Sequence, residues 1–143
     1  MADIVFEFPV SVPIERVFES VSSPAMLDQW WTKSAAGSPR LGEEYELAFG
    51  PGYDWRARVT QCEPPTSFEL EMTKADADWM GTRLTIQLSK VAGGTNVAFS
   101  HSGWPNANQH YRASCYCWAM YLRVMKRFLE SGEVVPYDER LDV

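Results

Sequence analysis

His101 is the residue of this sequence whose type and position best suit chemistry. It follows Val97 and Phe99 at intervals of two, so on a strand its ring points to the same apolar side as theirs. An imidazole in a cavity can bind the hydroxyl or carbonyl group of a ligand, or transfer a proton near neutral pH. The competing interpretation is structural, because a histidine near a strand end can hydrogen-bond a neighbouring group and fix the following turn. The residues alone leave all three roles open.

Large aromatic side chains form the second candidate group. Rings that carry one polar atom suit a pocket that holds an apolar ligand and fixes it with one or two hydrogen bonds. So many rings are also hard to pack to full density without leaving a void. For each residue alone, plain core packing is the competing interpretation. The predicted ligand-binding residues are Trp30, Tyr45, Tyr53, Trp55, Phe99, His101, Tyr111, Cys115, Trp118 and Leu122.

Other kinds of reactive site find little support. His101, His110 and the three cysteines do not stand at the spacing of a structural zinc site. No glycine-rich loop of the Walker or dinucleotide-binding type occurs. Cys115 could meet His101 across a cavity, but no third residue is identified that would orient such a pair. We therefore assign no catalytic residue and expect no metal and no cofactor.

Composition and charge narrow the classes of partner. The 143 residues carry 13 Lys and Arg against 19 Asp and Glu, and the net charge of −6 repels the phosphate backbone of nucleic acids. No apolar run approaches the ~18 residues of a membrane-spanning helix, and the first residues lack the pattern of a signal peptide. The cysteines number three, an odd count that suits a reducing compartment. We expect a soluble, cytoplasmic protein that binds neither nucleic acid nor membrane.

The elements that would position the candidate residues begin with strands. Ile4, Phe6 and Phe8 alternate with other residues and predict a first strand. Five later segments alternate in the same way, with turn residues between them. Their inward-facing residues are Tyr45, Leu47 and Phe49; Trp55, Ala57 and Val59; Phe68, Leu70 and Met72; Leu84, Ile86 and Leu88; and Val97, Phe99 and His101.

The opposite faces of three neighbouring strands carry charges. If these strands pair as an antiparallel meander, the charges form an acidic, basic and acidic ladder on the outer face of the sheet. We interpret this ladder as structural, because exposed ion pairs of this kind are ordinary features of sheet surfaces. Its members are Glu44 and Glu46, Arg56 and Arg58, and Glu69 and Glu71.

Two short helices are predicted after the first strand. Pro13 suits the first position of one of them, since its missing N–H is not needed there. Ser23 supplies the cap oxygen of the second, which carries Trp30 and Trp31. The small, polar residues 33–42 then predict a loop.

A long helix is predicted near the end of the chain. It begins at Asn106, with Gln109 as a partner in a capping box, and continues for about 25 residues to Gly132. Its apolar stripe must lie against the sheet, the only element large enough to cover it. That stripe consists of Tyr111, Cys115, Trp118, Leu122, Met125 and Leu129.

This order of elements predicts an α+β helix-grip fold. A curved antiparallel sheet of about six strands wraps around the long C-terminal helix, and two short helices lie between strands one and two. We expect residues 1–133 to form one domain and residues 134–143 to be a loosely held tail.

Four short motifs in the same order strengthen this prediction. They are Pro13–Phe18, Met26–Trp31, the pair Gly94–Val97 and His101–Trp104, and Phe128–Gly132. On these residues the sequence resembles the START-like (SRPBCC) superfamily, and is most similar to the branch named after the activator of the heat-shock-protein chaperone ATPase.

The resemblance implies a deep cavity between the sheet and the last helix, which members use to bind lipids, hormones, polyketides or other hydrophobic molecules. It implies no shared catalytic residues. Binding of a small hydrophobic ligand is therefore the leading hypothesis. A cyclase, dehydratase or hydrolase in which His101 moves a proton is the second. A stress-response domain that interacts with a chaperone is the third, and it would use the basic outer face of the last helix, formed by Arg112, Arg123, Lys126 and Arg127.

Overall fold

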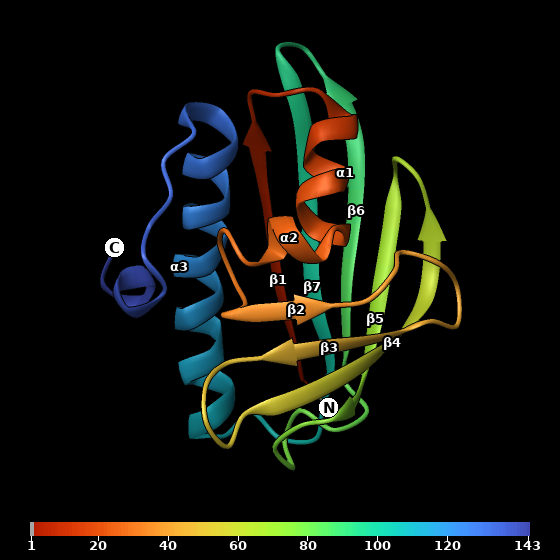
Figure 1. The fold of residues 1–143 in the computed structure, drawn as a ribbon, viewed down its shortest axis with the longest axis vertical. Helices are drawn as coiled ribbons and strands as arrows, with labels where there is room; N and C mark the ends of the chain where they lie inside the picture. The colour runs from red at the N-terminus through yellow and green to blue at the C-terminus, as the bar shows by residue number, and fades with distance from the viewer. Residues whose placement is uncertain (1) are drawn as a thin grey trace.

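A seven-stranded antiparallel sheet forms the body of the protein, whose computed structural model describes residues 2–143 (Figure 1). Across the sheet the strands lie in the order β1-β7-β6-β5-β4-β3-β2. Along the chain the elements are β1 (Ala2–Val10), α1 (Ile14–Ser22), α2 (Pro24–Leu27), β2 (Ser34–Ala36), β3 (Glu44–Ala48), β4 (Asp54–Glu63), β5 (Ser67–Lys74), β6 (Arg83–Val91), β7 (Gly94–Trp104), α3 (Gln109–Ser131) and the 3-10 helix η1 (Tyr137–Asp142). The prediction of an α+β helix-grip fold is confirmed. The additional strand is β2, which lies in the segment that was predicted to be a loop.

The sheet is strongly curved. Figure 1 shows β2 and β3 running across the direction of β6 and β7, with α1 and α2 against the concave face. The pairing of β4 with β5 is interrupted between Arg56 and Ala57 and again between Val59 and Gln61. Irregularities of this kind bend a strand and increase its twist. The curvature brings the end of β3 and the start of β4 towards α3.

The concave face carries the core that the alternation predicted. Leu84, Ile86 and Leu88 of β6 are buried and lie opposite His101, Phe99 and Val97 of β7 in the register of the sheet. The inward residues of β3, β4 and β5 are buried in the same way, except Trp55 of β4, which is half-buried. A single apolar core therefore extends beneath the sheet.

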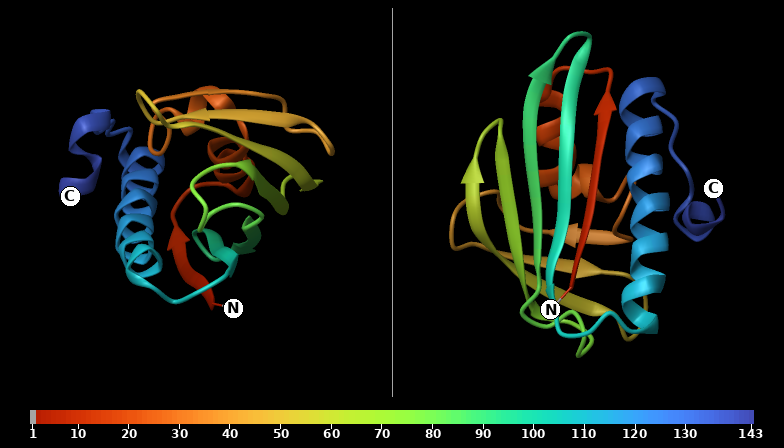
Figure 2. Two further views of the ribbon diagram at one scale, coloured as in Figure 1. Left: turned by 90° about the horizontal axis from the view of Figure 1, so that it is seen from below. Right: turned by 180° about the vertical axis from the view of Figure 1, so that it is seen from behind.

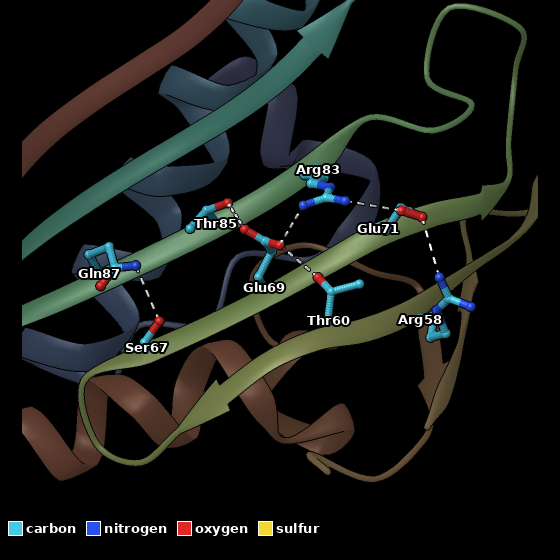
Figure 3. A network of polar contacts seen from close by, with 8 residues as sticks. All are labelled: Arg58, Thr60, Ser67, Glu69, Glu71, Arg83, Thr85 and Gln87. Carbon is cyan, nitrogen blue, oxygen red and sulfur yellow. Dashed lines mark hydrogen bonds and ion pairs between the residues drawn. The ribbon is translucent and has the colours of Figure 1, made fainter. Parts of the chain in front are cut away.

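The outer face carries the predicted ladder of charges (Figure 3). Arg58 of β4 pairs with Glu71 of β5 at 3.5 Å. The hydroxyl groups of Thr60 and Thr85 donate to the carboxylate of Glu69 at 2.7 and 2.9 Å. These contacts join three neighbouring strands through their side chains, so the structural interpretation of the ladder holds.

The long helix α3 stands beside β1, with the end of the chain on its far side (Figure 2). Its cap is Asn108, whose side chain accepts a hydrogen bond from the backbone N–H of Tyr111 at 3.0 Å. The predicted cap at Asn106 was therefore wrong by two residues. The helix ends as predicted at Gly132, which has a φ of 76° and donates to the carbonyl of Phe128. None of the helices in residues 2–143 has the length and hydropathy that crossing a membrane requires.

The C-terminal tail, expected to be loosely held, makes hydrogen bonds to the rest of the protein. Arg140 is buried at 3 % exposure, and its guanidinium donates to the carbonyls of Asp28, Thr32 and Val135 at 2.6, 3.1 and 3.0 Å. Tyr137 donates a further hydrogen bond to the carbonyl of Phe49 at 3.0 Å. One arginine thus satisfies carbonyls around the end of α2 and holds η1 in place.

Candidate ligand pocket

A pocket of about 400 Å³ lies where α3, the β3–β4 hairpin, the loop between β5 and β6 and the C-terminal tail meet. Eight of its fourteen lining residues are Phe, Trp or Tyr, so we call it the aromatic pocket. It is lined by Trp31, Phe49, Tyr53, Trp55, Asp76, Trp79, His110, Ala113, Ser114, Cys117, Trp118, Tyr121, Tyr137 and Leu141.

The β3–β4 hairpin supplies one wall of the aromatic pocket. The turn between the strands contains Gly50 and Gly52, with φ of 109° and 84°, values that glycine adopts without strain. This turn brings Phe49, Tyr53 and Trp55 together, with ring centroids 5.4 Å apart for Phe49 and Trp55 and 6.3 Å apart for Tyr53 and Trp55. Edge-to-face geometry of this kind fixes the rings relative to one another.

The loop between β5 and β6 supplies another wall through Trp79. Its ring stacks on Trp118 of α3 at 6.0 Å and 23°, and lies 4.9 Å from the ring of Trp55. The indole N–H of Trp79 is buried and finds no acceptor within residues 2–143. Ring packing, and not hydrogen bonding, therefore holds this indole in place.

His101 lies beneath the aromatic pocket and does not line it. Its ring is fully buried, its Nδ1 accepts from the indole N–H of Trp118 at 3.1 Å, and its Nε2 lies 2.8 Å from Oγ1 of Thr82. That hydroxyl donates in turn to the carbonyl of Trp79 at 2.6 Å. The hydrogen of the neutral ring is therefore on Nε2, which donates to Thr82. Burial, with a smaller contribution from His110, lowers the pKa of His101 to about 3.

These bonds give His101 a positioning role. It connects Trp118 of α3 to the loop that carries Trp79, so the two stacked indoles of the aromatic pocket share one buried support. A ring that is buried, neutral and bonded at both nitrogens is poorly placed to exchange a proton with a ligand.

Three of the ten predicted ligand-binding residues line the aromatic pocket: Tyr53, Trp55 and Trp118. Trp30, another of the ten, is buried and donates its indole N–H to the carbonyl of Ser20 at 2.9 Å. With Phe99 it borders a separate space of only about 30 Å³.

Tyr45 and three residues of α3 also lie away from the aromatic pocket. The hydroxyl of Tyr45 donates to the carbonyl of Ser22, and burial raises the pKa of this phenol. Tyr111 donates to the carbonyl of Asp3 at 2.7 Å, and Leu122 borders a groove beside β1. Cys115, between these two on the same stripe, packs against the core without lining the pocket. The predicted apolar stripe of α3 therefore faces β1 and the core over part of its length.

A different stripe of α3 faces the aromatic pocket, and its side chains are on the whole smaller and more polar than those of the predicted stripe. His110, Ser114, Cys117 and Tyr121 follow at intervals of four, three and four, the spacing of one helix face. The same spacing is visible in the sequence, but the stripe was missed because its residues do not read as an apolar set. Trp79 and Phe49 were also missed as pocket residues, although Phe49 continues the inward register of Tyr45.

The polar groups of the aromatic pocket are mostly uncharged. Burial raises the pKa of the Cys117 thiol and, as the largest cause, raises the pKa of Tyr121 to about 12, so both are protonated at neutral pH. Asp76 brings a carboxylate to the exposed side. Within residues 2–143 no group of three His, Cys, Asp or Glu side chains is arranged to hold a metal ion.

The curved sheet, the long helix beside it and the pocket between them define a START-like helix-grip protein. Residues 11–130 match the family model described as Activator of Hsp90 ATPase homolog 1-like protein. The chain belongs to this family, and the predicted branch of the superfamily is confirmed.

Solved structures share the fold over nearly the whole chain. The Aha1 dimer from Colwellia psychrerythraea is 25% identical with a TM-score of 0.85, and the match covers 93% of this chain and 99% of that one. Protein MLL2253 from Mesorhizobium loti is 18% identical with a TM-score of 0.81, covering 93% and 100%. CalU16 from Micromonospora echinospora is 19% identical with a TM-score of 0.76, covering 98% and 84%. The last two show similarity of fold alone. No curated protein matches the sequence.

Proposed function

We propose that the aromatic pocket binds a small apolar ligand that carries an aromatic ring. The observation that supports this most is the lining itself, since eight aromatic side chains surround about 400 Å³ of space. Ligand pockets usually have volumes of roughly 300–1,000 Å³ and are lined by apolar and aromatic residues with a few polar groups. Offset and edge-to-face contacts with a ligand ring would extend the contacts that these side chains already make.

The alternatives have less support. Catalysis by His101 would need a ring that reaches the ligand, whereas this ring is bonded to Trp118 and Thr82. A chaperone contact through the basic face of α3 would use Lys126 and Arg127, which already have acidic partners. Lys126 pairs with Glu130 at 3.2 Å and Arg127 with Glu133 at 3.6 Å. A cytoplasmic location remains our proposal, supported by three cysteines that are all free.

Calorimetric titration with 2-methylnaphthalene tests the proposed function. We expect binding that quenches tryptophan fluorescence, because four of the six tryptophans line the pocket. Cys117→Phe places a ring in the same space and should lower the affinity by about tenfold or more. Tyr116→Phe is the matched control, since Tyr116 is 70% exposed on the next position of α3. If the wild-type protein and Cys117→Phe bound 2-methylnaphthalene with equal affinity, the binding site would lie outside the aromatic pocket.

A further inference from the structure

An aspartate and a histidine meet at the edge of the aromatic pocket. Nδ1 of His110 lies 3.1 Å from Oδ2 of Asp78, and the side-chain amide of Asn108 donates to the same oxygen at 3.3 Å. The ring of His110 also packs edge-on against Trp104, with centroids 5.5 Å apart and planes at 88°. Two contacts of different kinds thus fix the plane of the imidazole.

The contact joins two elements that are distant in the sequence. Asp78 belongs to the loop between β5 and β6, and His110 to the first turn of α3. Asn108 has two roles: its side-chain oxygen caps the N-terminus of α3, and its side-chain amide donates a hydrogen bond to the carboxylate of Asp78. The capping of the helix therefore also sets the position of the histidine.

This geometry determines which nitrogen of His110 a ligand can use. An ionised carboxylate only accepts hydrogen bonds, so the neutral imidazole carries its hydrogen on Nδ1. Nε2 is then an acceptor. The side chain of His110 is 36% exposed and lines the aromatic pocket, so the ring remains accessible. In this respect it differs from His101, both of whose nitrogens are engaged.

We propose that His110, oriented by Asp78, recognises a hydroxyl group on the aromatic ligand. The proposal rests on the proposed function and adds the class of ligand, a phenol-like molecule. A hydroxyl both donates and accepts: it can donate to Nε2 of His110 and accept from Ser114, which lines the same pocket one helical turn further along. A carboxylate has no hydrogen to donate at neutral pH and would meet the charges of Asp76 and Asp78.

The test compares three ligands of one ring system: 2-naphthol, 2-methylnaphthalene and 2-naphthoate. In the wild-type protein we expect 2-naphthol to bind about three- to tenfold more tightly than 2-methylnaphthalene, the gain of one or two hydrogen bonds. 2-Naphthoate should bind more weakly than 2-naphthol. Calorimetric titration at pH 7.5 gives all three affinities.

Two variants assign the preference to the histidine. His110→Phe keeps a ring against Trp104 and removes the acceptor, so the ratio of the affinities for 2-naphthol and 2-methylnaphthalene should fall to about one. Asp78→Asn leaves the side chain of His110 unchanged in the pocket. Its amide can accept from Nδ1 or donate to it, so the ring hydrogen is no longer fixed on Nδ1 and the preference should fall. Near-ultraviolet circular dichroism shows whether each variant is folded.

The outcomes separate this inference from the proposed function. Equal affinity of the wild-type protein for 2-naphthol and 2-methylnaphthalene would overturn the inference and leave the pocket as an apolar site. So would a preference that survives in both variants, or tighter binding of 2-naphthoate. Failure of all three ligands to bind would overturn the proposed function, and the inference with it.

Discussion

The indole N–H of Trp118 donates to Nδ1 of His101 at 3.1 Å, in the buried layer directly beneath the aromatic pocket. Because the donor needs an unprotonated nitrogen, this bond exists only while the imidazole is neutral. The stacked pair of Trp118 and Trp79 therefore depends on the protonation state of a residue that does not line the pocket.

The first prediction concerns pH. The pKa of His101 is about 3 in the folded protein, against an ordinary value of 6.5. Below pH 6.5 the unfolded chain takes up a proton that the folded protein does not, so this contribution to stability is lost progressively as the pH falls towards 3. The slope approaches about 1.4 kcal/mol per pH unit.

Urea unfolding of the wild-type protein and of His101→Gln at pH 7, 6, 5 and 4 measures this effect. The variant loses hydrogen bonds of the buried ring and should be less stable at pH 7 by about 1–3 kcal/mol. Because glutamine cannot titrate, the variant does not share the loss of stability at lower pH. The difference between the two proteins should shrink as the pH falls. A difference that stays constant over this range would contradict the assignment of a neutral, buried His101.

The second prediction concerns the anchor of the tail. Arg140→Ala removes three hydrogen bonds to backbone carbonyls and leaves buried acceptors without a donor. We expect a loss of about 2 kcal/mol in the free energy of unfolding, or local release of residues 137–142. Hydrogen exchange distinguishes these results. Arg123→Ala, which removes an exposed arginine of α3, is the control and should change little.

The third prediction concerns the indole of Trp79. Its ring is buried between Trp55, Trp118 and His101, so Trp79→Ala should cost about 3–5 kcal/mol and weaken binding of any aromatic ligand. Met80→Ala, at an exposed neighbouring position, should stay within about 0.5 kcal/mol of the wild-type protein. Thermal unfolding monitored by near-ultraviolet circular dichroism measures both. Similar stabilities of the two variants would show that this ring is not part of the packed wall.

The fourth prediction concerns the outer face of the sheet. Glu69 accepts from two threonine hydroxyls and is only 16% exposed (Figure 3). By contrast, Glu44 is 54% exposed and pairs with Arg56. Glu69→Gln should therefore destabilise the fold by about 1 kcal/mol, and Glu44→Gln by less than about 0.5 kcal/mol. Chemical denaturation gives both values. Neither change should affect ligand affinity, and a loss of binding in Glu69→Gln would point to a site on this face.

The fold could be predicted from the sequence because its signals are local and repeated. The alternation of Phe68, Leu70 and Met72 indicates which face of β5 is buried. The alternation in the neighbouring strands indicates the same face of the sheet. By contrast, β2 has three residues, too few for an alternation to appear. The cap of α3 was misplaced because Asn106 and Asn108 are equally good caps in sequence, and only the position of the Tyr111 N–H distinguishes them.

The pocket could be predicted less well, because its walls meet only in three dimensions. Trp79 stands in a loop, where periodicity gives no direction for a side chain. Which stripe of α3 faces the pocket depends on how the helix is rotated about its axis beside β1. The stripe that contains Tyr111 and Leu122 has the larger, more apolar side chains and was therefore predicted to face the pocket. Arg140 looks like a solvated charge in sequence, and its burial depends on carbonyls more than 100 residues earlier in the chain.

The buried Arg140 belongs to the same short helix as Tyr137 and Leu141, which form part of the pocket wall. The position of this helix and the shape of the pocket are therefore coupled. A ligand in the pocket would contact Tyr137 and Leu141, whose short helix is held in place by the guanidinium of Arg140. A dye attached at Val143 should therefore change its emission when the pocket fills, which would turn the protein into a sensor for its own ligand.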